Sequence, residues 1–428
     1  MKQPKNIIEL VKHFFFKSNR SRFERNFLEV ASANTFAQLL AFLISPILTR
    51  LFSPNEFGIV AVFTSFQGIL LSFAILRIDW SIPNTKSRVQ AVSLFIIGTL
   101  ILFMVSIVTL IIVIFLITDK IYWKDLQDVE LYLLLLPVAL VGQGLQLLLQ
   151  SWYIRESDLS VVGKTRITQT LASTAINILG GIFRLGAWAL IVSTVSTAWI
   201  GVIKLLRFAA NFQKSLMRVS ITKLKVSWIR FWRESLLSTS VAIINTVSLS
   251  IIPLLLAQLY STTEVGWYAF MMRLVMTPIS TITGAIGQSF WAEAAILIKH
   301  DRAALRKLYL TLSMRLSLLA IPIVLICLCG PLYTGFIFGQ DWSAAGYILA
   351  SLSPFLFGQI VVSPISHLII HRKQHWQFIW DTARFLLLIA VFMLASTGQL
   401  DITQTVLLIS ITLSVMYALL FKLNLANL

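Results

Sequence analysis

The amino-acid sequence predicts an all-α integral membrane protein with about 12 transmembrane helices, arranged as two six-helix lobes related by a pseudo-two-fold axis. Three observations support this prediction. Apolar segments recur along nearly the whole chain, basic residues are concentrated in alternate loops, and one short phrase is written twice, about half a chain apart.

The composition is that of a protein embedded in lipid. The 428 residues are 57% hydrophobic and only 12% charged, and the mean hydropathy is +0.84, whereas soluble domains carry about 25% charged residues. Apolar runs such as 92–118, 131–153 and 403–421 are long enough to cross a hydrocarbon layer of about 30 Å as helices. We expect spans that begin near residues 28, 58, 91, 130, 167, 186, 235, 266, 309, 343, 377 and 403.

Basic residues are distributed asymmetrically across these spans. Of the 35 Lys and Arg residues, 27 lie in the N-terminal segment, in alternate loops or near the C-terminus, five lie within spans, and three lie in the opposite loops (Lys120, Lys124 and Arg184). Cytoplasmic loops of membrane proteins carry an excess of Lys and Arg. The formal net charge of +17 therefore indicates orientation and not nucleic-acid binding. We expect a multi-pass protein of the bacterial cytoplasmic (inner) membrane with both termini in the cytoplasm.

Four segments follow from this pattern. We expect a basic interfacial segment at residues 1–26, a six-helix lobe at 27–206, an amphipathic cytoplasmic linker at 207–234 and a second lobe at 235–428. No cleavable signal peptide is evident, because no small-residue cleavage site follows the first apolar segment. The loops on the opposite side are too short for a soluble catalytic domain.

The repeated phrase reads LFSPNEFG at residues 51–58 and LYSTTEVG at residues 259–266. In each copy a serine precedes a glutamate by three residues, which is the capping-box pattern of a helix start, and a glycine follows. These residues are Ser53, Glu56, Gly58, Ser261, Glu264 and Gly266. Each phrase is expected to begin the second helix of a lobe. Because both copies begin on the same side of the membrane, the repeat predicts an axis along the membrane normal and a cavity between the lobes.

Three stretches resemble one known family. The run NTFAQLLAFLISPILTRLFSPNEFGIVAVF resembles the first two helices of Wzx-type polysaccharide flippases, LYSTTEVGWYAFMMRLVMTPISTITGAIGQSFW resembles their seventh and eighth helices, and LQSWYIRESDLSVVGKTRI resembles the connection between helices four and five. The resemblance implies the multidrug/oligosaccharidyl-lipid/polysaccharide exporter fold, alternating access and no enzymatic activity. It also implies an undecaprenyl-pyrophosphate-linked O-antigen or capsule repeat unit as cargo, and a polysaccharide polymerase and a chain-length regulator as partners.

Five arginines lie within the expected spans, and we predict that they form a cationic substrate cavity: Arg50, Arg77, Arg273, Arg315 and Arg384. A cation near the bilayer centre costs about 2.5 to 3.5 kcal/mol on insertion scales, so the presence of each of these arginines in a span requires a structural or functional explanation. The alternative to a cavity role is that an arginine near a helix end extends to the membrane surface (snorkelling). We favour snorkelling for Arg50 and Arg77, and for Arg315 we give the two explanations equal weight.

Arg273 has no acid within a helical turn, and Pro278 follows it, so we expect it to face the cavity. The resemblance implies the same, because an arginine in this helix of the family faces the central cavity. Arg384 follows Asp381 by three residues, which predicts either a structural ion pair or a transport role. Aromatic residues that could pack on sugar rings are Trp267, Tyr268, Phe270, Trp291 and Trp380.

Asp381 and Glu29 are the candidates for coupling transport to a proton or sodium ion, because both acids fall within spans. We expect no cofactor and no metal site. His367, His371 and His375 share a helical face, but the cations Arg372 and Lys373 beside them oppose metal binding. Two cysteines, Cys327 and Cys329, are read as small hydrophobic residues, because their spacing does not suit a structural disulfide.

Two other function classes were weighed against a flippase. An exporter of small amphipathic compounds, like the drug extruders of the same superfamily, is the alternative, but a surplus of buried cations over acids favours anionic cargo. A polymerase, ligase or glycosyltransferase is disfavoured because the chain has no large external loop and no Asp-x-Asp sugar-nucleotide motif.

The predicted topology can be tested by thiol labelling. A cysteine introduced at Asn55 or Thr263, after replacement of Cys327 and Cys329, should react with an impermeant thiol reagent added to intact cells. The repeated phrases are expected to face outward, away from the basic loops. Labelling only in opened vesicles would show that the true topology is the inverse of the predicted one.

Overall fold

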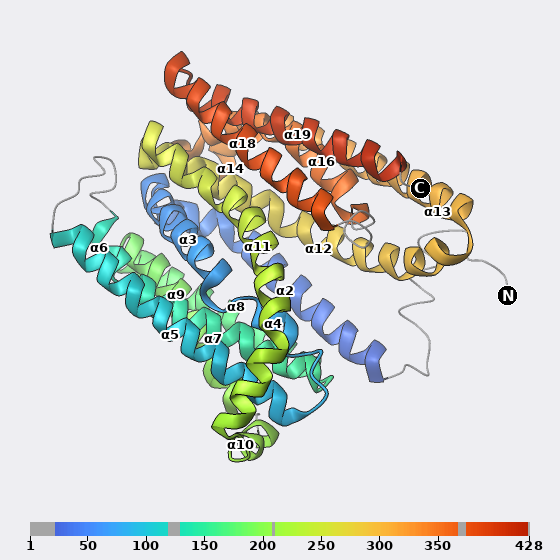
Figure 1. Ribbon diagram of the computed structural model, residues 1–428. Coiled ribbons are helices and arrows are strands. Elements are labelled where there is room, and N and C mark those ends of the chain that lie inside the picture. Colours follow the sequence, from blue (N-terminus) through green and yellow to red (C-terminus); the bar gives the residue numbers. More distant parts are fainter. Residues whose placement is uncertain (1–21, 119–128, 208–209, 367–373, 427–428) are drawn as a thin grey trace.

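A computed structural model describes residues 22–118, 129–207, 210–366 and 374–426 (Figure 1). These residues are almost entirely helical and contain no strand. The all-α class is therefore confirmed, and the chain is a multi-pass membrane protein. Within the described ranges, nine helices are long and apolar enough to cross a membrane, or ten if one bent pair is counted as a span.

The helices follow one another through short turns. The first group comprises α2 (Arg22–Leu51), α3 (Pro54–Ala74), α4 (Ile78–Ser81), α5 (Arg88–Thr118), α6 (Glu130–Leu133), α7 (Leu136–Arg155), α8 (Leu159–Ile182) and α9 (Ala187–Arg207). After α10 (Ala210–Leu216) come α11 (Ile221–Leu259), α12 (Thr262–His300), α13 (Arg302–Leu328), α14 (Gly330–Phe338), α15 (Ala345–Ser351), α16 (Ser353–Val362), α18 (Gln374–Gly398) and α19 (Ile402–Ala426). The 3₁₀ turns are η1 (Gln340–Trp342) and η2 (Ser363–Ile365).

Each of the 12 expected spans corresponds to a helix or a bent helix pair, so the prediction of about 12 helices agrees with the structure. Two of these helices, α8 and α11, are absent from the apolar candidates, and α11 qualifies only over the short apolar stretch Ile243–Leu259. The tenth span is the pair α15 and α16, which is bent by 51°. Polar helices of this kind are tolerated in a membrane where they face other helices or a water-filled space.

In the part of the expected linker (207–234) that the structure describes, residues 210–216 and 221–234 are helical, and this part packs against the first group of helices. On α10, the ring of Phe212 lies 4.8 Å from that of Phe95 and 5.2 Å from that of Trp152, between ring centroids. Ser81 and Ser235 share a hydrogen bond of 3.4 Å. Because α11 runs without a break through residue 234 into the next span, the division into lobes at 27–206 and 235–428 stays a proposal.

The two repeated phrases have the same local structure, and they lie against each other. Both capping boxes form: the Ser53 and Ser261 backbone N–H groups donate to Glu56 and Glu264 at 2.6 and 2.9 Å. Thr262 of the second phrase also donates a hydrogen bond to the side-chain oxygen of Asn55 in the first. The repetition therefore builds a pseudo-symmetric contact between the start of α3 and the start of α12.

The two glycines of the phrases make this contact possible. A Cβ atom added to Gly58 would lie 1.8 Å from the Thr262 carbonyl oxygen, and one added to Gly266 would lie 1.8 Å from the Pro54 carbonyl oxygen. Only residues without a side chain allow the backbones of two helices to approach this closely.

Aromatic rings extend the contact toward the interior. Phe57 of α3 lies 5.2 Å from Phe270 of α12 and 5.2 Å from Trp342 of η1, and Phe270 and Trp342 are 4.6 Å apart, between ring centroids. The Trp342 indole N–H donates to the Thr49 carbonyl of α2 at 3.1 Å. We call this region, formed by the two glycines and these three rings, the closed end of the bundle.

The glycine contact generates a stability prediction. Gly58→Ala should lower the thermal unfolding midpoint of the purified protein in detergent, because overpacking typically costs about 1–3 kcal/mol. Gly284→Ala, in α12, is the matched control, because a Cβ at Gly284 meets nothing within 4 Å. The control should leave the midpoint unchanged or raise it slightly. Equal midpoints for the two variants would contradict the tight crossing.

Candidate substrate cavity

A cavity of about 820 Å³ lies between the two groups of helices. Its walls come from α3, α9, α11, α12, α16, η2, α18 and α19. At one limit it reaches Phe57 and Phe270 of the closed end, and at the other it reaches Ser366 after η2 and Trp376 at the start of α18. The cavity thus extends away from the seal between the repeated phrases, toward the ends of the helices where the basic loops attach.

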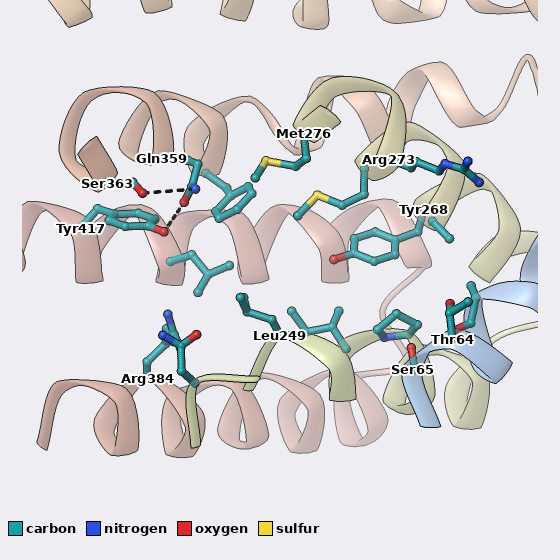
Figure 2. A pocket seen from close by; sticks show the side chains of 18 of the residues that line it. Thr64, Ser65, Leu249, Tyr268, Arg273, Met276, Gln359, Ser363, Arg384 and Tyr417 are labelled. Carbon is teal, nitrogen blue, oxygen red and sulfur yellow. Dashed lines mark hydrogen bonds between the residues drawn. The ribbon is translucent and has the colours of Figure 1, made fainter. Parts of the chain in front are cut away.

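Arg273 lines this cavity from α12 and is exposed to it. In Figure 2 it lies beside Tyr268, on the side of the cavity where Thr64 and Ser65 of α3 also appear. The Thr277 hydroxyl donates to the Arg273 carbonyl oxygen at 2.5 Å, within the turn that precedes Pro278. No acidic side chain is among the described residues that line the cavity, so Arg273 contributes a cation that no lining acid neutralises.

Arg384 lines the cavity from α18, but it is paired with an acid. Its Nη2 atom lies 3.0 Å from Oδ1 of Asp381, and the two side chains are 4% and 0% exposed. The guanidinium carbon lies 4.8 Å from the centroid of the Trp380 ring, so the cation also stacks on an aromatic face. The predicted pairing of Asp381 and Arg384 is present, and together the two side chains are electrically neutral.

Uncharged polar groups line the cavity on the same side as Arg384. The Tyr417 hydroxyl of α19 donates to Oε1 of Gln359 on α16, and Nε2 of Gln359 donates to the Ser363 hydroxyl at 3.4 Å (Figure 2). The rings of Trp380 and Tyr417 are 6.1 Å apart between centroids. We refer to Gln359, Ser363, Trp380, Arg384 and Tyr417 as the Gln359 cluster.

The sequence did not single out Gln359, Ser363 or Tyr417, because they lie on separate helices and share no motif. One local signal was present. A Cβ at Gly358 would lie 2.9 Å from the Tyr417 ring, so this glycine allows α16 to approach α19 closely. In an apolar helix, a glycine followed by a glutamine is a weak sign of such a site.

Three of the five predicted arginines do not line the cavity, which corrects the expectation of one site containing all five. Arg50 is exposed in the last turn of α2. Arg315 is exposed on the face of α13 that also presents Met314 and Leu318, which are 69% and 62% exposed. That face points away from the other helices, as snorkelling requires.

Arg77 lies outside a regular helix. It adopts a left-handed backbone conformation (φ 51°) at the break between α3 and α4, and its guanidinium stacks on the Trp80 ring at 4.5 Å. Burial raises the pKa of the neighbouring Asp79, and the charge of Arg77 partly opposes that rise. Arg77 is therefore associated with the break in the chain and not with the cavity.

Of the predicted aromatic residues, Tyr268, Phe270 and Trp380 line the cavity, whereas Trp267 and Trp291 do not. The Trp267 indole N–H donates to the Asp341 carbonyl at 2.9 Å, and Trp291 packs against the apolar core.

The remaining candidates cannot be placed in the cavity. Glu29 belongs to α2, but its side chain lies outside what the structure describes, and so do His367, His371 and the side chain of His375. Within the described part of the chain, no group of three or more His, Cys, Asp or Glu residues could hold a metal ion.

Comparisons with known proteins identify a family and a fold. The family model described as "Polysaccharide biosynthesis protein" matches residues 47–346, which is more than half of the chain. Among solved structures, the lipid II flippase MurJ in an inward closed conformation superposes with a TM-score of 0.67 at 15% sequence identity, covering 92% of this chain and 86% of that one.

Drug transporters give similar superpositions. An inward-facing multidrug resistance MATE family transporter of the MOP superfamily has a TM-score of 0.60 at 14% identity, covering 98% of this chain and 97% of that one. The eukaryotic MATE transporter AtDTX14 has a TM-score of 0.57 at 15% identity, covering 95% and 99%. Identities this low show a shared fold only. A comparison with curated proteins found no match.

The buried ion pair generates a second stability prediction. Asp381→Ala or Arg384→Ala should each lower the free energy of unfolding by about 3–5 kcal/mol, because each leaves a buried charge without its partner. The double variant Asp381→Leu/Arg384→Met should lose much less. Unfolding in mixed micelles measures these effects. Arg315→Ala is the control and should change the free energy by no more than about 0.5 kcal/mol. Additive losses in the double variant would contradict the pairing.

Proposed function

Because the chain belongs to the polysaccharide biosynthesis protein family and has the fold of MOP-superfamily transporters, we propose that it is a flippase. Its cargo is an undecaprenyl-pyrophosphate-linked oligosaccharide, which it moves across the bacterial cytoplasmic membrane for assembly of a surface polysaccharide. It performs no chemistry on that cargo. The likeness of fold to the lipid II flippase MurJ supports this proposal.

The observation that carries the proposal is the charge of the cavity. Two arginines and no acid are among its described lining residues, and Arg384 is already neutralised by Asp381. The surplus cation, Arg273, suits a pyrophosphate, because a guanidinium offers paired donors that match phosphate oxygens. Moving a pyrophosphate through hydrocarbon without such a partner is costly.

The closed end supports transport by alternating access. It closes one end of the cavity, and the excess of Lys and Arg in the alternate loops supports the proposal that this end faces the outer side of the membrane. The structure then corresponds to a state that receives cargo from the cytoplasm. Release on the outer side requires α3 and α12 to separate at Gly58 and Gly266, which breaks the hydrogen bond between Thr262 and Asn55 and the packing of Phe57 on Phe270.

Ion coupling and partners belong to the same proposal. Asp381 and Glu29 are the candidates for a coupling ion. Protonation of Asp381 would remove the negative charge that faces Arg384, so coupling through Asp381 would change the charge of the cavity. A polymerase and a chain-length regulator are proposed partners, because a translocated repeat unit must be polymerised on the outer side.

An exporter of small amphipathic compounds is the second candidate, and its support is the likeness to MATE transporters. That likeness shows the fold alone. A cationic compound would meet Arg273 without a lining carboxylate to bind it, so the charge of the cavity favours the anionic cargo.

The experiment that tests the function locates the cargo when the gene is deleted. Intact spheroplasts are treated with an impermeant glycan-modifying reagent, and lipid-linked oligosaccharide is then extracted. Oligosaccharide that escapes modification lies on the cytoplasmic face, and its accumulation there supports a flippase. Unpolymerised oligosaccharide that reacts on the outer face shows that transport is intact and overturns the proposal.

Arg273 provides the sharpest residue-level prediction. Arg273→Ala should reduce export by about tenfold or more at equal membrane levels, because a charge-assisted hydrogen bond contributes about 1.5–3 kcal/mol. Arg273→Lys should retain part of the activity. Arg315→Ala is the matched control, since it removes an arginine that does not line the cavity. Export is measured as surface polysaccharide, and wild-type levels in Arg273→Ala would remove this residue from the mechanism.

A further inference from the structure

We propose that the Gln359 cluster is a sugar-binding subsite, separate from Arg273, and that it holds an uncharged hydroxyl-bearing ring of the cargo. This inference rests on the proposed function, because it assigns parts of one cargo to parts of one cavity. Its basis is the different chemistry of the two sides of that cavity.

The two sides differ first in charge. Arg273 on α12 has no lining acid to neutralise it, whereas the charge of Arg384 is neutralised by Asp381 at 3.0 Å. In Figure 2, Arg384, Gln359, Ser363 and Tyr417 appear on one side of the cavity, and Arg273 appears on the other. A pyrophosphate gains most from the surplus cation. The neutral side offers it little and leaves room for uncharged groups.

The neutral side also has unused hydrogen-bonding capacity. An amide carries two N–H donors and two lone pairs, and a hydroxyl both donates and accepts. Nε2 of Gln359 makes one hydrogen bond, to Ser363, and Oε1 of Gln359 accepts one, from Tyr417. A second amide N–H and a second carbonyl lone pair are left for a ligand. Paired donors and acceptors of this kind suit the vicinal hydroxyls of a sugar.

Aromatic faces complete the subsite. Trp380 and Tyr417 both line the cavity, with ring centroids 6.1 Å apart and planes inclined by 49°. Trp380 is held in place at two points: its indole N–H donates to the Met416 carbonyl at 3.2 Å, and Arg384 stacks on its ring. Tyr417 is held by its bond to Gln359. Rings fixed in this way lose little conformational freedom when the apolar face of a sugar packs on them.

The arrangement gives the cargo an orientation. With the pyrophosphate beside Arg273, the first sugars extend toward α16, α18 and α19, which are all helices of the second half of the chain. The first half supplies the opposite wall through α3 and α9. Sugar recognition is thus asymmetric, although the closed end is built from two similar phrases.

Binding of two probes to the purified full-length protein tests the subsite. One probe is undecaprenyl pyrophosphate without sugars, and the other is the lipid-linked repeat unit extracted from cells in which the gene is deleted. Gln359→Leu should weaken binding of the sugar-bearing lipid by about three- to tenfold, as expected for lost hydrogen bonds to an uncharged ligand. The same variant should leave binding of the sugar-free lipid within about twofold.

Tyr417→Phe is the second variant. It removes the hydroxyl that holds the Gln359 amide in position but keeps the aromatic ring, so it should also weaken binding of the sugar-bearing lipid more than binding of the sugar-free lipid. Tyr309→Phe is its matched control. Tyr309 lies on α13, does not line the cavity, and donates to the Phe421 carbonyl at 3.4 Å. The control should bind both probes as the wild-type protein does.

The outcomes separate the subsite from the function. If Gln359→Leu and Tyr417→Phe weaken the binding of both probes equally, the cluster is a structural network and the subsite is overturned. The subsite is also overturned if neither variant weakens the binding of either probe. Failure of the wild-type protein to bind either probe would overturn the proposed function and the subsite with it. Unchanged binding of both probes by Arg273→Ala would remove Arg273 from the site and overturn the assignment of pyrophosphate and sugar to two sides of the cavity. Weakening of both probes by Arg273→Ala, with sugar-selective loss in the two cluster variants, supports both.

Discussion

The close crossing of α3 and α12 at Gly58 and Gly266 is the contact on which the rest of the cavity depends. Backbone atoms of the two helices touch there, so no side chain sets their separation. The Phe57, Phe270 and Trp342 rings then fill the space directly behind the glycines. Because the helices meet so tightly at one end, the space between them widens only beyond these rings, where the cavity begins.

Arg384 and Arg273 both line the cavity, but their charges are balanced differently. At Arg384 the protein supplies its own counter-charge, and the buried pair serves to hold Trp380 and the polar groups around it. At Arg273 no lining residue supplies one, so the cation remains available to an anion from outside. A low-dielectric environment makes both arrangements strong, because an unpaired charge there interacts with whatever anion approaches. One cavity therefore combines an arginine paired with an acid and an arginine with no lining acid.

Sequence patterns were sufficient for the fold and for part of the site. The capping boxes at Ser53 and Ser261 were predicted correctly because such boxes involve residues only three positions apart. Arg273 and Arg384 were identified because a charge in an apolar run is conspicuous. Arg50 and Arg315 have the same signal, and only the packing shows that they do not face the cavity. Gln359 has only the weak signal of the preceding Gly358, and Tyr417 has none, because their site exists only where α16 and α19 meet.

The contact between the two glycines also could not be predicted from the sequence. Repetition indicated two equivalent helix starts, but it did not indicate that the starts touch. The asymmetry of the arginines was visible in the sequence, since the position of the first copy that matches Arg273 is Ser65. Ser65 also lines the cavity, so the pseudo-symmetric positions face one space with different chemistry.

The unbroken α11 has a mechanical consequence. At 39 residues it is about 58 Å long, at 1.5 Å per residue. It is anchored to the first group of helices through Phe231 and Ser235, and its far end turns directly into α12. The part of α11 beyond Ser235 is about 36 Å long, so a tilt of about 10° about Ser235 would displace its far end by about 6 Å, by the same geometry. Pro253, which lies in the cavity wall, lacks a backbone N–H and so removes one hydrogen bond of the helix, which allows α11 to bend beside the cavity.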